Sequence, residues 1–210
     1  GVPILLRTLR RFSAVPAVAE LIVVVAKDEV AFVEEMLEKA QGLKPWRVAQ
    51  GGAERQYSIA NGMAHLAANA DVVLVHDAAR PLVSLAAIEA VIFAAREKGA
   101  AIAAVRAKNT IKVVGEDGRV EATPSRASLW EVQTPQGFRR EILERAYEKA
   151  AQDGFLGTDD ASLVERIGEA VFVVESDYGN LKITTPEDLW MAEALLAHPA
   201  GIADEMKVTI

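Results

Sequence analysis

The fold is decided by residues 71–81, whose sequence is DVVLVHDAARP. Its apolar start is typical of a buried parallel strand, which is covered on both faces and therefore lacks a polar alternation. Asp77 and Arg80 follow directly, and ligands of open α/β sheets bind just beyond the carboxyl ends of the strands. We expect Asp77 to hold a hard cation such as Mg²⁺, and Arg80 to bind phosphate oxygens. The alternative is an aspartate that caps a helix beside a surface arginine.

Strands and helices alternate on both sides of this stretch. Apolar runs typical of strands occupy residues 20–26, 46–50, 71–76 and 100–105. Helical patterns occupy residues 5–12, 29–41 with Asp28 as the expected N-cap, a segment from Gly52 to about residue 69, and 84–98 before Gly99. The repeated strand–helix–strand units predict a single α/β domain over residues 1–210, with a mostly parallel sheet and helices on both faces.

Residues 109–123 interrupt this alternation with a hairpin pattern around Gly118 and few side chains large enough for a core. A two-stranded hairpin is marginally stable alone, and its open edges favour pairing with another chain. We therefore expect an arm that projects from the domain and forms a homodimer. The elements expected after the arm are helices at 139–152 and 159–167, a strand at 170–174, and a helix from Pro186 to about residue 197.

Composition argues against several classes of protein. The 210 residues carry a formal net charge of −7, which disfavours a nucleic-acid-binding protein. The longest apolar runs are of strand length, too short to cross a membrane. The absence of cysteine excludes a disulfide framework and suits a reducing cytosol. The three histidines lack the spacing of zinc ligands, and Walker, Gly-x-Gly-x-x-Gly and Gly-x-Ser-x-Gly patterns are absent.

The helical pattern of residues 5–12 opens the sequence with no strand before it. A doubly wound domain normally begins with a strand whose following loop binds phosphate. We therefore expect that strand and its glycine-rich loop to lie outside the 210 residues of this sequence.

Three further segments place polar groups beside expected strands and helices. The glycines at 51–52 follow a strand and open a helix, where their amides can approach a ligand and Ser58 adds a hydroxyl; a plain turn is the alternative. Lys182 stands at an expected strand end, where it either binds an anion or extends to solvent. We interpret the carboxylates of Asp159 and Asp160 as caps of the next helix.

Seven motifs occur in a fixed order along nearly the whole chain. They are GGAERQYS at 51–58, VHDAARP at 75–81, TIK at 110–112, RASLW at 126–130, QTPQGF at 133–138, TDDA at 158–161 and NLKITTPEDL at 180–189. In these motifs the chain resembles the 2-C-methyl-D-erythritol 4-phosphate cytidylyltransferases. One such match would be weak, but seven in the right order are specific.

The resemblance implies a Rossmann-like nucleotidyltransferase fold and a homodimer in which the arm of each chain clasps the other. It also implies a reaction that requires Mg²⁺. In that reaction a phosphate oxygen of 2-C-methyl-D-erythritol 4-phosphate attacks the α-phosphorus of CTP, and pyrophosphate is released. Catalysis of this kind depends mainly on alignment and charge stabilisation, because two phosphate-bearing reactants repel each other.

By the same resemblance, Gly52, Ala53 and Ser58 contact the cytidine nucleotide, and Asp77 holds the metal ion. The groups implied to surround the methylerythritol phosphate come partly from the partner's arm. They are Arg80, Thr110, Arg126, Thr134 and Lys182, of which Arg126 and Lys182 hold the substrate in line for attack.

Two positions depart from the family pattern. Asn109 stands where an aspartate usually precedes the Thr-Ile-Lys of the arm. Ala53 stands where an aspartate is common, which leaves any cytosine contact there to the backbone. Two other functions are compatible with the motifs. One is a cytidylyltransferase for a pentitol phosphate such as ribitol 5-phosphate, and the other is a non-catalytic dimeric binding protein of the same fold.

Overall fold

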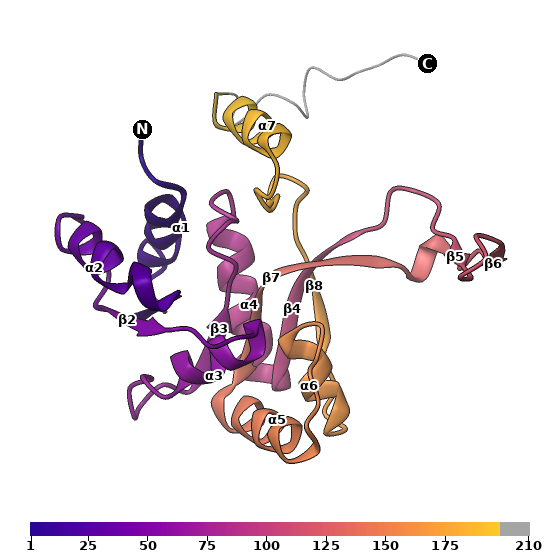
Figure 1. The fold of residues 1–210 in the computed structure, drawn as a ribbon, viewed down its shortest axis with the longest axis horizontal. Coiled ribbons are helices and arrows are strands. Elements are labelled where there is room, and N and C mark those ends of the chain that lie inside the picture. The colour runs from indigo at the N-terminus through magenta and orange to yellow at the C-terminus, as the bar shows by residue number, and fades with distance from the viewer. Residues whose placement is uncertain (198–210) are drawn as a thin grey trace.

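The computed structural model describes residues 1–197. Its largest sheet has the strand order β3 (Val72–Val75), β7 (Trp130–Arg139), β4 (Ala100–Arg106) and β8 (Phe172–Glu175). β4 and β8 are parallel, whereas β7 is antiparallel to both β3 and β4, so three of these four strands share one direction. The predicted α/β sheet is confirmed, and β7 is the exception to its parallel order (Figure 1).

Strand β7 is not predicted from the sequence pattern. This strand contains Pro135 and Gly137, residue types that are depleted in strand interiors. Gly137 is required because helix α4 (Leu85–Lys98) packs closely here: a Cβ would lie 2.8 Å from the side chain of Val91 and 2.9 Å from that of Leu74. The strand is therefore defined by its packing between neighbours and not by a periodic pattern.

A second sheet consists of β1 (Leu21–Val25) and β2 (Trp46–Gln50), which pair in parallel. A groove of about 620 Å³ is lined by residues of β1 and β3 and by the loop that follows β3. Within residues 1–197, β1 pairs only with β2 and β3 only with β7. One backbone edge of each strand is therefore open.

Three predicted helix ends differ from the structure, and one of them is the end of α2 (Val30–Glu38), which stops at Glu38 and not at residue 41. Asp28 is not the N-cap of α2, because a 3-10 turn at Lys27–Glu29 precedes the helix and Glu29 takes the cap position. Helix α3 (Arg55–Met63) ends well before residue 69. It ends there because the N–H groups of His65 and Leu66 bond to carbonyl groups three residues back, which tightens and closes the last turn.

Helices cover both faces of the central sheet, as predicted. On one face α4 packs with α1 (Ile4–Ser13), α2 and β1 around a cluster that includes Ile88. On the other face α5 (Arg140–Asp153) and α6 (Asp160–Arg166) pack on β3 and β4, with α3 at the margin. Ser84 caps α4 by accepting the N–H of Ala87, and Gly99 ends the helix, as predicted, with φ of 97°.

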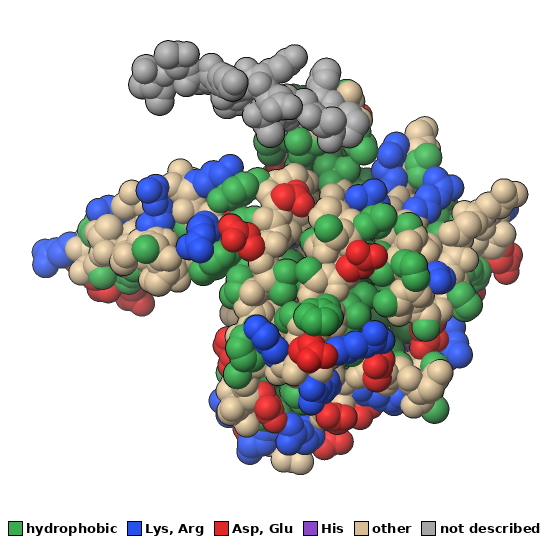
Figure 2. Space-filling model, turned by 180° about the vertical axis from the view of Figure 1, so that it is seen from behind, with side chains coloured by type: hydrophobic (Ala, Val, Ile, Leu, Met, Phe, Trp, Pro, Cys, Tyr) green, Lys and Arg blue, Asp and Glu red, His purple; other side chains and the backbone are tan. Residues whose placement is uncertain are grey.

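The predicted arm is present and projects from the rest of the chain (Figures 1 and 2). Its antiparallel strands β5 (Val113–Val114) and β6 (Val120–Ala122) are joined through a turn in which Gly118 has φ of 79°. The three valines at 113, 114 and 120 are exposed. The last described helix, α7, spans Pro186–Ala197 and begins at Pro186 as predicted. None of the helices within residues 1–197 is both long and apolar enough to cross a membrane.

Candidate active site

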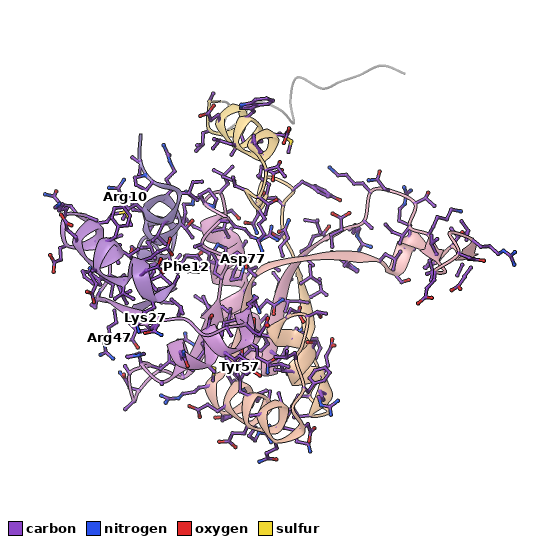
Figure 3. All side chains as sticks on the ribbon, viewed as in Figure 1. Arg10, Phe12, Lys27, Arg47, Tyr57 and Asp77 are labelled. Carbon is purple, nitrogen blue, oxygen red and sulfur yellow. The ribbon has the colours of Figure 1, made fainter. Side chains whose placement is uncertain are left out.

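Asp77 lies at the centre of the candidate site. It follows β3 at the carboxyl end of that strand, as predicted, and Figure 3 shows it in the middle of the molecule close to Phe12. Its Oδ2 atom is 3.1 Å from Nε of Arg80 and 3.3 Å from Nζ of Lys182. Burial alone would raise the pKa of Asp77, but the charges of Lys182 and Arg80 outweigh it and hold the pKa below its ordinary value. Asp77 is therefore a carboxylate at neutral pH.

The alternative role of Asp77 as a helix cap is not supported. The next helix, α4, is capped by Ser84. Arg80 is not a surface arginine either, because its side chain is only 12% exposed. Its Nη1 atom donates to the carbonyl oxygen of Asn180 at 2.7 Å.

Lys182 reaches Asp77 from a loop and not from a strand end, so the predicted strand position is wrong. Strand β8 ends at Glu175, and the loop after it is held against the loop after β3. The N–H of Ile183 donates to the carbonyl oxygen of Ala79 at 2.8 Å. These backbone contacts outside any strand place the Lys182 ammonium group beside Asp77.

A chain of hydrogen bonds fixes the backbone of Asp77. Its N–H donates to Oγ1 of Thr134 at 3.0 Å, and this hydroxyl lies 3.1 Å from Nδ1 of His76. Burial lowers the pKa of His76 to about 4, so the ring is neutral at pH 7 and carries one N–H. Nε2 faces the carbonyl oxygen of Arg80 at 3.1 Å and must be the donor, because a carbonyl only accepts. Nδ1 therefore accepts the hydroxyl proton of Thr134.

This arrangement gives Thr134 a structural task that the sequence did not indicate. Its side chain is buried, and its hydroxyl both accepts from Asp77 and donates to His76. The expected contact between Thr134 and a substrate remains a prediction. His76 is a functional residue that the sequence did not indicate, because the three histidines show no ligand spacing and its hydrogen bonds form only in the fold.

The glycine loop before α3 has a shape that its neighbours enforce. The N–H of Gly51 donates to the carbonyl oxygen of Val25 at the end of β1 at 2.7 Å, and the N–H of Gly52 donates to Oγ of Ser58 at 3.1 Å. A Cβ on Gly52 would lie 2.5 Å from Cβ of Tyr57, so only glycine fits. The loop is thus more than a plain turn: it is folded back onto the first turns of α3.

The groove between β1 and β3 joins this loop to the Asp77 cluster. Arg55, Ser58 and Asp77 all line it. Two of the predicted nucleotide-binding residues, Ser58 on α3 and Asp77 in the loop after β3, are therefore brought to one cavity. Gly52 and Ala53 are exposed in the loop before α3 and do not line the groove.

The two predicted substrate-binding residues of the arm are not part of this cluster within one chain. Thr110 and Arg126 are exposed, and the arm extends away from β3 and α3 (Figure 1). Nη1 of Arg126 donates to the carbonyl oxygen of Lys108 at 2.7 Å, which holds the residue at the base of the arm.

Asp159 and Asp160 have different tasks. Asp159 caps α6 in a capping box with Ser162, as predicted. Asp160 is not a cap: its carboxylate is completely buried and pairs with Arg55, which the sequence did not indicate.

The donor set fits a magnesium ion that is shared with a substrate. Within residues 1–197 no group of three His, Asp or Glu side chains could form a metal cage. Mg²⁺ is commonly held by one or two carboxylates together with substrate phosphates and water. Asp77 supplies one such carboxylate, and the neighbouring cations are placed to balance phosphate charge.

Comparison with known proteins identifies the family of this chain. A sequence model of the family 2-C-methyl-D-erythritol 4-phosphate cytidylyltransferase matches residues 1–198. A curated protein of that name from Caldanaerobacter subterraneus subsp. tengcongensis is 45% identical over 197 residues, which cover 93% of this chain and 87% of the relative. The protein of that name from Symbiobacterium thermophilum is 48% identical over 95% of this chain and 83% of its own length.

Solved structures agree with the sequence relatives. The crystal structure of 4-diphosphocytidyl-2C-methyl-D-erythritol synthase from Anaerococcus prevotii superposes with a TM-score of 0.86 at 35% identity, covering 92% of this chain and 89% of that chain. The 2-C-methyl-D-erythritol 4-phosphate cytidylyltransferase from Thermus thermophilus gives a TM-score of 0.75 at 34% identity, with coverage of 90% and 87%. From its fold, its site and these relatives, the chain belongs to the 2-C-methyl-D-erythritol 4-phosphate cytidylyltransferase family.

Proposed function

We propose that this protein transfers the cytidylyl group of CTP to 2-C-methyl-D-erythritol 4-phosphate. The products are 4-diphosphocytidyl-2-C-methyl-D-erythritol and pyrophosphate, and the reaction belongs to non-mevalonate isoprenoid precursor synthesis in the cytosol. The observation that carries the proposal is Asp77, flanked by Arg80 and Lys182 in the groove that Ser58 also lines. Family membership supports the choice of both substrates.

The chemistry is a displacement at phosphorus. A phosphate oxygen of the methylerythritol phosphate forms a bond to the α-phosphorus of CTP, and the bond from that phosphorus to the bridging oxygen breaks, so pyrophosphate leaves with the electron pair. No general base is needed, because the nucleophile is already an anion. The protein must instead bring the two anionic substrates, CTP and methylerythritol phosphate, together, and this requires cationic side chains and precise alignment.

Lys182 and Arg80 supply positive charge at this place. Lys182 uses one contact on Asp77, and its side chain is 45% exposed, so the ammonium group has donors available for a phosphate. Arg80 is enclosed and fixed by two partners, Asp77 and Asn180. We assign Lys182 to binding the phosphate of methylerythritol phosphate. We propose that Arg80, which stays bonded to Asp77, offsets the negative charge of the bound phosphates.

Magnesium is part of the proposal. Asp77 would hold Mg²⁺ together with phosphate oxygens of the nucleotide, and the bound ion would offset phosphate charge at the reacting centre. Chelation of Mg²⁺ by EDTA should abolish turnover, and added Mg²⁺ should restore it. Full activity in EDTA would contradict the assignment of Asp77 as a metal ligand.

The nucleotide and arm assignments complete the site. We propose that Gly52 and Ala53 contact the cytidine through their backbones and Ser58 through its hydroxyl. We further propose that Thr110 and Arg126 bind the methylerythritol phosphate of the partner's site, because the arm carries them away from their own Asp77 cluster (Figure 1). On this view residues 1–210 act as one domain within a homodimer.

The test is pyrophosphate release by the purified protein with CTP and Mg²⁺. We expect turnover that depends on methylerythritol phosphate and is at least about tenfold slower with ribitol 5-phosphate, a difference of roughly 1.4 kcal/mol in transition-state stabilisation. Faster turnover with ribitol 5-phosphate would identify the pentitol enzyme instead. Binding of CTP without turnover on either alcohol phosphate would identify a binding protein.

A further inference from the structure

A buried cluster outside the assigned site holds the first turn of α3. Arg55 is the first residue of this helix, between the glycine loop and Ser58. Its Nη2 atom donates to Oδ2 of Asp160 at 2.7 Å, and the hydroxyl of Tyr147 donates to the other oxygen, Oδ1. The side chain of Asp160 is 1% exposed, whereas that of Arg55 is 42% exposed. The pair thus reaches from the interior to the nucleotide loop.

Burial and charge keep the protonation states of the three side chains in this cluster constant. A buried carboxylate is tolerated only when its oxygens are paired, and both oxygens of Asp160 have partners. Burial raises the pKa of Tyr147 and the charge of Asp160 raises it further, so the phenol keeps its proton and remains a donor. Burial would lower the pKa of Arg55, but the charge of Asp160 outweighs it and raises the pKa, so the guanidinium stays charged.

A second anchor lies beside the first. Nε2 of Gln56 donates to the carbonyl oxygen of Phe155 at 3.0 Å, and the N–H of Gly157 donates to Oε1 of Gln56 at 2.9 Å. Both leading residues of α3 are therefore held by the segment 155–160. Glu54, the N-cap residue of α3, makes no side-chain cap bond, so these outside contacts stand in for a cap.

The segment that provides the anchors is itself fixed to the central sheet. Gln136 of β7 donates from Nε2 to Oδ2 of Asp159 at 2.8 Å and accepts the N–H of Ala161 at 3.1 Å. On the same strand, Thr134 holds the backbone of Asp77. β7 therefore supports the loop after β3, which carries Asp77, directly. It supports the glycine loop before α3 through segment 155–160.

We infer that Asp160 is a positioning residue for the nucleotide, acting through Arg55 on the loop at Gly52 and on Ser58. The inference rests on the proposed function, because it assigns the loop to CTP. Asp160 does not touch the substrate. Its buried charge holds Arg55, and Arg55 holds the first turn of α3 in the orientation that presents the loop backbone and the Ser58 hydroxyl to cytidine. Methylerythritol phosphate, bound by Lys182 and the partner's arm, does not depend on this anchor.

The experiment compares Asp160→Asn with the parent by steady-state kinetics and by calorimetric titration with CTP. Asparagine keeps the shape and removes the charge. We expect the KM and Kd for CTP to rise about tenfold or more, while the KM for methylerythritol phosphate stays within about twofold. The matched control is Glu35→Gln on α2, which likewise removes one carboxylate charge, from an ion pair with Lys39 in which both side chains are exposed; it should leave all three constants unchanged.

A purely structural role would give a different result. Asp160→Asn would then lower the midpoint of unfolding and the fraction of active protein, but the folded fraction would bind CTP with the parental Kd. That outcome overturns the inference. If Asp160→Asn does not fold, Tyr147→Phe is decisive, since it keeps the ion pair and loosens only one side of the carboxylate. A rise of about threefold in the Kd for CTP supports positioning, and an unchanged Kd contradicts it.

If the proposed function is wrong, the measurements on the parent protein will show it. The parent itself would then show no turnover with methylerythritol phosphate. Calorimetry with CTP would still report whether Asp160 orders the loop.

Discussion

Nζ of Lys182 lies 3.3 Å from Oδ2 of Asp77, so the loop after β8 meets the loop after β3 through one pair of opposite charges. The two partners differ in exposure: the lysine side chain is 45% exposed and the aspartate side chain 17%. The ammonium group is open to a phosphate, while Arg80 encloses the carboxylate. We interpret the ion pair as the contact of the substrate-free protein. When a phosphorylated substrate binds, its phosphate can take the place of the Asp77 carboxylate as the partner of Lys182.

Replacement of Asp77 by Asn should lower turnover about a hundredfold or more, equivalent to roughly 3 kcal/mol of lost transition-state stabilisation. The substitution keeps the shape but removes the charge that we assign to Mg²⁺. The measurement is pyrophosphate release at saturating substrates, over a range of Mg²⁺ concentrations. Asp71→Asn is the matched control, because Asp71 precedes the same strand and pairs with Arg96 at an exposed position. Activity of Asp77→Asn within about threefold of the parent would end the assignment.

Lys182→Gln should raise the KM for methylerythritol phosphate and lower kcat, since the lysine both binds the nucleophile and holds it in line. A combined loss in kcat/KM of about a hundredfold is expected, with little change in the Kd for CTP. Lys149→Gln, at an exposed ion pair on α5, serves as the control. A loss confined to CTP binding would transfer Lys182 from the methylerythritol phosphate to the nucleotide.

Thr134→Val should destabilise the protein by about 2 kcal/mol and also reduce turnover. Valine matches threonine in shape but leaves the N–H of Asp77 and Nδ1 of His76 without a partner, and each unpaired buried group costs about 1–3 kcal/mol. The free energy of unfolding from urea denaturation measures the first effect. Thr134→Ser should recover most of both losses because it restores the hydroxyl. Equal stability of the Val variant and the parent would remove Thr134 from the network.

The arm can be tested by mixing two inactive proteins. If Arg126 acts in the partner's site, then a heterodimer of Asp77→Asn and Arg126→Ala chains contains one site with both residues intact. Mixing the two variants after mild dissociation should therefore restore up to about half of the parental activity per heterodimer, by counting the intact sites of a C₂ dimer. Sedimentation should give about twice the 22.6 kDa of the chain for the parent. A monomeric parent, or no recovery on mixing, would contradict the shared site.

The central part of the fold could be predicted from the sequence because its strands are apolar runs of the right length. β3 follows directly from Val72–Val75, and the position of Asp77 follows from β3. β7 could not be predicted in this way, because Pro135 and Gly137 are unfavourable in strands and only the close packing of Val91 and Leu74 explains the glycine. The position of β7 depends on contacts with residues distant in sequence, and a local sequence pattern does not reveal such contacts.

The candidate site could be predicted in part for a similar reason. Asp77 next to a strand end and Ser58 in the first turns of the helix after a glycine loop are visible from local spacing. The task of Asp160 is not, because the cap at Asp159 explains the same motif and the partner Arg55 is distant in sequence. His76 was missed because a single buried histidine has no spacing to interpret.

The strand order has a consequence for how the chain is made. β7 lies between β3 and β4 although it follows both in the sequence. A nascent chain that has emerged only to Arg106 therefore contains β3 and β4 without the strand that joins them. Such non-local pairing closes late and leaves unpaired edges in the meantime. The middle of the sheet is filled only after synthesis has passed Arg139, and β8 joins its edge only after Glu175. Because segment 155–160 anchors the loop before α3, the proposed nucleotide and metal loops acquire their common support only once that segment has also been made.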